Sequence, residues 1–296
     1  MSIIATIDQR DWQQFEAISL DELNQTSSML TRLDNKYLLR EPVLKLALEQ
    51  FAKHFHILEI DNSRVFTYES CYFDDENLRC YYDHHQGRRQ RMKVRTRKYL
   101  ESNLCFIEVK LKDSRGVTIK KRQPHDIEHF GEIDSAALQY VNDEYRALYG
   151  RHFSDHLLAT LQMTYGRATL VAKQGGERIT IDKQIQFEHI NKTYSTPADI
   201  FVIETKSTNG NGIADAILRK FHQHTSNKCS KYCIGMCITK QVKRYNNFMP
   251  TLRKLGTISA KTLVPTFDNK TKNTQVFISE STENQASPAD NLQQAL

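Results

Sequence analysis

The stretch "RMKVRTRKYL", residues 91–100, carries the pattern that decides the fold. Every second position is a cation: Arg91, Lys93, Arg95 and Arg97. Because side chains of a β-strand alternate between its two sides, a strand here would have one cationic face and one face of Met, Val and Thr. Like charges that lie side by side destabilise a sheet unless something of opposite charge offsets them. The segment therefore predicts a strand whose cationic face meets an anion.

The positive charge of the chain is concentrated around this stretch. The chain has 296 residues and a net charge of +6, with ordinary proportions of hydrophobic (39%) and charged (26%) residues. Residues 88–122 contain 13 Lys and Arg against 3 acids, a surplus of +10, so the remainder of the chain has a balance of −4. We expect the partner of this segment to be a polyanion or a small anion with several charges.

The sequence also indicates the cellular compartment of the protein. No apolar run approaches the roughly 20 residues needed to cross a bilayer, and the first residues show no signal peptide. We therefore expect a cytoplasmic protein with no transmembrane segment of its own. The six cysteines form no CxxC pair, which favours reduced thiols.

Hydrophobic periodicity predicts an α+β fold. The segments with strand patterning are 31–40, 54–60, 65–74, 91–100, 104–112, 116–122, 157–170, 177–190 and 200–207. The segments with helical patterning are 42–51, 124–150, 211–224 and 230–245, after a helical lead-in over residues 1–30. Residues 257–296 are rich in Thr, Ser, Asn and Gln and are predicted to be a disordered tail. We therefore expect one domain over residues 1–256.

Several predicted strands pair a charged face with an apolar face, and two arrangements explain this. In an open antiparallel sheet the charged face is simply wet. In a sheet curled into a barrel with its charged face inside, the same residues line a cationic tunnel. Carboxylates share these charged faces: Asp34, Glu108, Asp182 and Glu204. They are either ion-pair partners or oxygen ligands for Mg²⁺ or Mn²⁺. The sequence has no GxxxxGK[ST] or GxGxxG phosphate-binding loop.

At these residues the sequence resembles the VTC domain (vacuolar transporter chaperone, polyphosphate polymerase), within the triphosphate tunnel metalloenzyme fold. The motifs that carry the resemblance are "RLDNKY", "SCYFDDENLRCYYDHH", "RMKVRTRKY", "FIEVKLK", "YGRATL", "ERITID", "VIETKS" and "SKY", in this order from about Arg32 to Met249. The resemblance implies an antiparallel β-barrel tunnel flanked by helices.

The resemblance also implies roles for individual residues. Basic residues that match those lining the family's tunnel are Lys36, Arg95, Arg97, Lys110, Arg167, Arg178 and Lys206. Further candidates for substrate binding are Arg91, Lys93, Ser230 and Lys231. Glu204 matches the metal-binding glutamate, and Asp34 and Glu108 are candidate co-ligands. The eukaryotic pattern has an additional upstream arginine, for which this chain offers His84, Arg88 or Arg91.

The resemblance implies a metal-dependent enzyme, with Mn²⁺ or Mg²⁺, that transfers the γ-phosphate of ATP onto a polyphosphate chain. Two alternatives use the same cations: a tunnel-fold triphosphatase acting on triphosphate or nucleoside triphosphate, and a module that binds polyphosphate without turnover. Nucleic acid is not an expected partner, because the cations alternate along strands and do not form a patch interleaved with stacking aromatics. A membrane-protein partner remains open for a polymerase without its own membrane helices.

Overall fold

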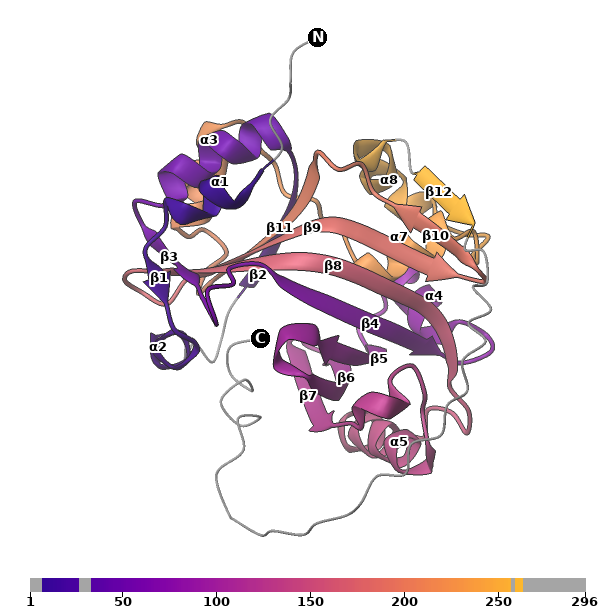
Figure 1. Ribbon diagram of the computed structural model, residues 1–296. Coiled ribbons are helices and arrows are strands. Elements are labelled where there is room, and N and C mark those ends of the chain that lie inside the picture. The colour runs from indigo at the N-terminus through magenta and orange to yellow at the C-terminus, as the bar shows by residue number, and fades with distance from the viewer. Residues whose placement is uncertain (1–6, 27–32, 257–258, 263–296) are drawn as a thin grey trace, which may run out of the picture.

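Eight antiparallel strands form the main sheet of the protein, and the computed structural model shows them curled around a common interior (Figure 1). The described residues are 7–26, 33–256 and 259–262. In spatial order the strands are β2 (Leu33–Arg40), β11 (Ile200–Ser207), β9 (Arg178–His189), β8 (Leu158–Ala172), β4 (Phe66–Asp74), β5 (Arg91–Tyr99), β6 (Leu104–Lys112) and β7 (Thr118–Pro124). Within the described residues β2 and β7 do not pair with each other, so the barrel is not fully closed.

Short strands pair with the ends of β8 and β9 that extend beyond the neighbouring long strands. The far end of β9 pairs with β10 (Lys192–Ser195), and β10 pairs with β12 (Ser259–Thr262). The far end of β8 pairs with β3 (Phe55–Leu58), which in turn pairs in parallel with β1 (Ala17–Ile18). Strand β12 lies within the segment that the sequence assigns to a disordered tail. Residues 263–296 of that predicted tail lie outside the described residues.

The helices cover the outside and the ends of the sheet (Figure 1). They are α1 (Gln9–Gln13), α2 (Leu20–Thr26), α3 (Glu41–Phe51), α4 (Arg79–Gln86), α5 (Ser135–Tyr149), α6 (Ile213–Lys220), α7 (Lys231–Ile238) and α8 (Met249–Leu255), with short 3₁₀ turns at Leu100–Ser102, Ile127–His129 and Asn246–Phe248. No helix among the described residues is both long and apolar enough to span a bilayer.

Apolar side chains of the strands point outward and form the core beneath the helices. On β2 and β11, Tyr37 and Ile203 are buried beside Leu44 and Leu48 of α3 in one apolar cluster. Helix α3 begins with Pro42 in its first turn, where a missing N–H costs nothing. Its buried residues recur every three or four positions, which is why one face of the helix packs on the sheet. The predicted inversion, with the apolar face outside, is therefore present in the structure.

Helix α7 is the exception, because it packs against the inner face of the sheet. Gly235 lies so close to β8 and β9 that an added Cβ would stand 2.3 Å from Leu161 Cδ2 and 2.6 Å from Phe187 Cδ1. The side chain of Tyr232 stacks on Tyr72 of β4, with ring centroids 5.0 Å apart. Helix α7 therefore fills one end of the interior.

Candidate functional site

Charged side chains from seven strands face one another inside the curled sheet. Residues directly opposite each other in an antiparallel pair share a face of the sheet. The rows of paired residues on the inner face are Asp34–Lys206–Arg178, Lys36–Glu204–Thr180, Asp182–Arg167, Tyr72–Arg95–Glu108 and Lys93–Lys110–Lys120. Every predicted basic residue of the tunnel except Arg97 appears in these rows, and Arg97 lies opposite Ser70 of the same face.

The first group of charges centres on Glu204 of β11. Its carboxylate accepts from Lys36 Nζ at 2.5 Å and lies 3.3 Å from Lys206 Nζ. Burial alone would raise the pKa of Glu204, but Lys206, Lys36 and Lys110 hold it well below its usual range. Burial lowers the pKa of Lys206 to about 7 despite the attraction of Glu204. The site therefore keeps an ionised carboxylate among several closely spaced lysines.

Lys110 of β6 shows most directly that the sheet curls. Its side chain is exposed to solvent, and it has no ion pair within the described residues. Burial among protein groups, followed by repulsion from Lys120, lowers its pKa to about 7, with further contributions from Glu204, Lys36 and Lys93. Strands β6 and β11 are separated by four others in the sheet. An electrostatic interaction between Lys110 and Glu204 therefore requires that both point into one interior.

The second group joins Arg95 of β5 to Glu108 of β6. Arg95 Nε donates to Glu108 Oε2 at 2.7 Å, and Nη1 donates to the Tyr72 hydroxyl at 2.9 Å. The Tyr99 hydroxyl donates to the other carboxylate oxygen at 3.1 Å. Burial opposes ionisation of Glu108, but Arg95 and then Arg97 lower its pKa to about 2. Arg95 is thus held by two partners in a fixed orientation with part of its guanidinium facing the interior.

The third group joins Arg167 of β8, Asp182 of β9 and Lys231 of α7. Arg167 donates twice to the carboxylate, from Nε at 2.6 Å and from Nη2 at 2.9 Å. Lys231 Nζ donates to the same carboxylate. The side chain of Asp182 is only 1% exposed, against 10% for Arg167 and 15% for Lys231. This pair of bonds is the bidentate geometry in which arginine binds carboxylates and phosphates most strongly.

Tyrosine and serine side chains bind Arg97 without neutralising its charge. Arg97 donates to the Tyr165 hydroxyl at 2.9 Å and to Ser70 Oγ at 3.1 Å, and it is only 3% exposed. The ring of Tyr165 stacks on Tyr68, with centroids 5.4 Å apart, and Lys231 Nζ lies 5.1 Å from the Tyr165 centroid. Hydroxyls and ring faces contact the donors of Arg97 while leaving its charge uncompensated.

The N-terminal end of α7 meets the cationic strands. Ser230 caps the helix, its hydroxyl accepting from Cys233 N at 3.4 Å, and the same hydroxyl accepts from Lys93 Nζ at 2.7 Å. Since Lys231 binds Asp182, the first turn of α7 is fixed to both β5 and β9. The predicted pair Ser230 and Lys231 therefore lies beside the predicted strand residues, as the "SKY" motif suggested.

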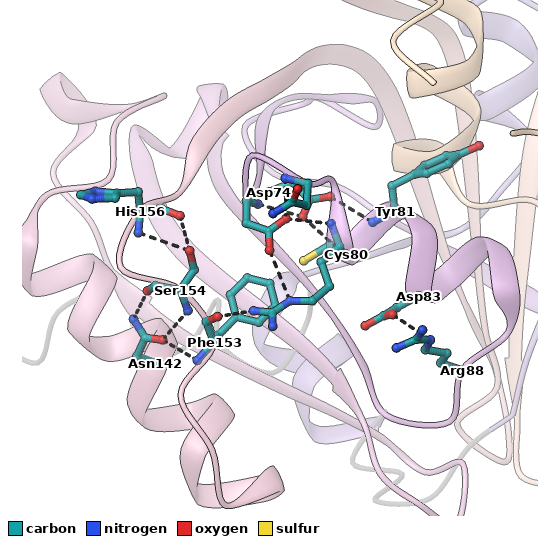
Figure 2. A network of polar contacts seen from close by, with 12 residues as sticks. Asp74, Cys80, Tyr81, Asp83, Arg88, Asn142, Phe153, Ser154 and His156 are labelled. Atoms are coloured by element: carbon teal, nitrogen blue, oxygen red, sulfur yellow. Dashed lines mark hydrogen bonds and ion pairs between the residues drawn. The ribbon is translucent and has the colours of Figure 1, made fainter. Parts of the chain in front are cut away.

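A network next to the site holds α4 and α7 in place, and Figure 2 shows the part of it around Asp74 and α4. Asp74, at the end of β4, accepts from the backbone N–H groups of Cys80 and Tyr81 and from the Tyr232 hydroxyl at 2.7 Å. Burial raises the pKa of this carboxyl to about 6. Arg79 reaches the carbonyl oxygen of Phe153, which joins the start of α4 to the segment after α5. The carboxylate of Asp74 therefore caps α4 and anchors the helix that carries Lys231.

The three candidates for the upstream arginine separate in the structure. His84 lies among cations: burial, then Lys93, Arg91, Lys228 and Lys110, lower its pKa far below the usual value. Arg88 turns outward to Asp83, with the charged groups 3.2 Å apart. Arg91 donates to the Arg88 carbonyl oxygen. His84 and Arg91 are therefore the two that reach the inner cations.

The three predicted metal ligands are placed differently. Glu204 lies among the lysines, Glu108 is bound by Arg95 and Tyr99, and Asp34 is exposed beside Lys206. Within the described residues no group of three or more His, Cys, Asp or Glu side chains is arranged to hold a metal ion. One ionised carboxylate still suits a Mg²⁺- or Mn²⁺-type ion that takes most of its remaining oxygens from water and phosphate. Glu204 fits that requirement best.

The sequence left Asp182 open between an ion-pair partner and a metal ligand, and the structure pairs it with Arg167 and Lys231. The pattern of "YESCYF" favours core positions for its aromatic residues, and Tyr68 and Tyr72 are buried in the core. Their rings also contact arginines of the inner face: the ring centroid of Tyr68 lies 5.1 Å from Cζ of Arg167, and that of Tyr72 lies 5.7 Å from Cζ of Arg95. Sequence reasoning missed this second role, although these tyrosines alternate with Thr67, Glu69 and Cys71 as the cations of β5 alternate with apolar residues. Trp12 of α1, for which the sequence also favours a core position, is buried.

Known proteins resemble this chain in sequence profile and, more distantly, in structure. The sequence profile of the VTC domain family matches residues 31–240. A search of curated protein sequences found no significant match. Among solved structures, a Bacillus halodurans protein provisionally named adenylate cyclase is 11% identical, with a TM-score of 0.42, covering 68% of this chain and 95% of its own. A Hippeastrum protein provisionally named adenylyl cyclase, reported to have a dominant triphosphatase activity, is 14% identical, with a TM-score of 0.44, covering 73% and 99%.

Proposed function

Because the chain belongs to the VTC domain family, we propose that it is a metal-dependent polyphosphate polymerase. It transfers the γ-phosphate of ATP onto a polyphosphate chain held inside the barrel. The observation that carries the proposal is the excess of positive charge on the inner face after its carboxylates are paired. Within the described residues Arg91, Lys93, Arg97 and Lys110 have no ion pair. Linked phosphates supply the missing negative charge at a regular spacing.

The inner cations provide what phosphoryl transfer requires. Arg95, Arg97 and Arg167 have planar guanidinium groups suited to two phosphate oxygens at once, and the lysines act as point charges. Fixed groups of this kind stabilise the charge that develops in the transition state without having to reorganise. We propose that these side chains orient the end of the polyphosphate chain in line with the triphosphate of ATP.

A divalent ion would be held by Glu204 together with phosphate oxygens, with Asp34 and Glu108 as further proposed ligands. When bound, it supplies positive charge that neutralises the oxygens of the transferred group. Lys36 and Lys206 contact Glu204 in this structure. With the ion bound, each lysine would either keep its contact with the Glu204 carboxylate beside the ion or bind a phosphate oxygen of the substrate.

The ionisation of the inner carboxylates favours a phosphate chain over water as the nucleophile. A general base works best with a pKa near the working pH, whereas neighbouring cations hold the pKa of Glu108 at about 2 and the pKa of Glu204 well below its usual range. Bound phosphates would also keep Lys110 and Lys206 protonated. A terminal phosphate oxygen is already anionic and needs no base. The triphosphatase reaction remains the second candidate.

The test is an assay of the purified protein with ATP and Mn²⁺ or Mg²⁺, with chain lengths resolved on a gel. Long products that an exopolyphosphatase degrades support the polymerase. Release of inorganic phosphate alone supports the triphosphatase, and tight polyphosphate binding without turnover supports the binding module.

The variant Glu204→Gln tests whether Glu204 holds the catalytic metal ion. It should lose turnover and keep polyphosphate binding, whereas Glu49→Gln on the exposed surface of α3 should change neither. If Glu204→Gln turns over ATP at the wild-type rate, Glu204 does not hold the catalytic ion. Competition between polyphosphate and single-stranded RNA tests the expectation that nucleic acid is not a partner.

A further inference from the structure

Five cations lie on three segments that meet next to the end of α4. They come from three separate segments and define what we call the mouth surface: Arg88, Arg89, Lys228, Lys243 and Arg244. Arg88, Arg89, Lys243 and Arg244 are exposed, and Lys228 is half-buried. None of these residues is among those that the family resemblance assigns to the tunnel, except for Arg88 as one of three alternatives.

Hydrogen bonds hold the three segments together. The Tyr81 hydroxyl of α4 donates to the Arg244 carbonyl oxygen at 2.7 Å, and Asn247 Nδ2 donates to the His85 carbonyl oxygen at 2.8 Å. A Cβ built on Gly87 would lie 4.0 Å from Lys228 Nζ. The loop after α4, the segment before α7 and the segment 243–247 therefore form one continuous surface.

The mouth surface is poor in negative charge. Asp83 pairs with Arg88 at 3.2 Å, as Figure 2 shows. In the part of the chain that the structure describes, Arg89, Lys228, Lys243 and Arg244 have no ion pair. Exposed cations that lie close together repel one another unless a ligand or salt screens them. Such a surface favours an anion that spans several of them.

The mouth surface is continuous with the interior of the barrel. Arg91, whose side chain donates to the Arg88 carbonyl oxygen, begins β5 two residues before Lys93. Burial, and then the charges of Lys93, Arg91, Lys228 and Lys110, lower the pKa of His84, so this residue of α4 lies within electrostatic range of both the strand cations and Lys228 of the mouth surface. A linear anion that extends out of the barrel would therefore contact the cations of the mouth surface directly after those of the interior.

We propose that the mouth surface binds a stretch of linear polyphosphate outside the barrel, so that the protein holds long chains more tightly than short ones. The proposal rests on the proposed function, because it needs a phosphate chain in the interior. Inorganic triphosphate contacts only the cations inside the barrel, whereas a long polyphosphate chain contacts these and also the mouth surface. Affinity should therefore rise with chain length beyond what fills the barrel.

The test is a charge-reversal variant, Arg89→Glu/Lys243→Glu/Arg244→Glu, with Arg88 left in place to keep Asp83 paired. The matched control is Lys53→Glu/Lys192→Glu/Lys220→Glu, three exposed lysines in the turn after α3, on β10 and at the end of α6, with the same change in net charge. Binding of triphosphate and of long-chain polyphosphate is measured by calorimetry at two salt concentrations, after circular dichroism has shown that each variant melts as the wild type does.

The mouth variant should bind triphosphate within about twofold of wild type and bind long chains roughly 10- to 100-fold more weakly, the loss expected for a few cations at a polyanion. Its affinity for long chains should also depend less steeply on salt. The control should differ little from wild type for both ligands. Equal losses in the two variants, or an unchanged affinity of the mouth variant for long chains, overturn the proposal. A wild type that binds neither ligand refutes the proposed function itself.

Discussion

Replacing Asp182 by Asn tests whether the interior depends on its built-in carboxylates. The substitution keeps the size of the side chain but removes the charge that pairs with both Arg167 and Lys231. Removing one partner of a buried ion pair costs about 3–5 kcal/mol, because the remaining charge stays buried and uncompensated. Arg167 and Lys231 retain some contact with solvent, which screens them. We therefore expect a loss of about 3 kcal/mol.

The assay is thermal and urea unfolding followed by circular dichroism and by the fluorescence of the single tryptophan, which is buried in the core at Trp12. A loss of this size should lower Tm by roughly 5 °C for a protein of this length. The matched control is Asp199→Asn, whose pair with Arg40 spans 2.7 Å but is about half exposed. An exposed pair of this kind contributes about 0–1 kcal/mol. If the two variants lose equal stability, the reasoning about the interior is wrong.

A second arm of this experiment adds ligand. In Asp182→Asn the two cations lack their carboxylate, so triphosphate should raise Tm more in the variant than in the wild type. An equal or smaller rise in the variant would mean that the anion does not reach Arg167 and Lys231.

Three further substitutions test other parts of the site. Tyr72→Phe removes the hydroxyl that accepts from Arg95 at 2.9 Å, and titration with triphosphate should show roughly three- to tenfold weaker binding without loss of Tm. Gly235→Ala forces a methyl against Leu161 and Phe187, and urea unfolding should show a loss of about 1–3 kcal/mol. The pKa of Asp74 is raised from 3.8 to about 6, so the native state holds its proton to higher pH than the unfolded chain. The stability of the wild type relative to Asp74→Asn should therefore fall by up to about 3 kcal/mol from pH 4 to pH 7, and a flat difference would contradict this.

Strand alternation predicted the inner face well, because a period of two fixes which residues lie together whatever the tertiary fold. The four cations of the stretch 91–97 and the carboxylates Glu108 and Glu204 lie on this face. The pair Ser230 and Lys231, which came from the resemblance and not from the alternation, lies beside them at the start of α7. The curling of the sheet was an expectation from the resemblance. The structure supports it through electrostatic interactions across the interior, such as the influence of Glu204 on the pKa of Lys110.

Contacts that depend on helix placement could not be predicted in the same way. Helix α7 reads as an ordinary apolar helix, and only the close approach of Gly235 to β8 and β9 shows that it packs on the inner face. The roles of Asp74 and Tyr232 follow from that placement. The mouth surface likewise joins segments more than 100 residues apart in the chain, which no local pattern connects.

The pairing of inner cations with Glu108, Asp182 and Glu204 has a consequence for how tightly any ligand is held. The interior carries its own counter-ions, so the protein can fold before a ligand arrives. An incoming phosphate must compete with a carboxylate for each shared cation, and only the difference between the two pairings contributes to affinity. Each local attachment is thus weak even where the total charge is large. A molecule held by many exchangeable contacts can shift by one repeat at a time without first being released.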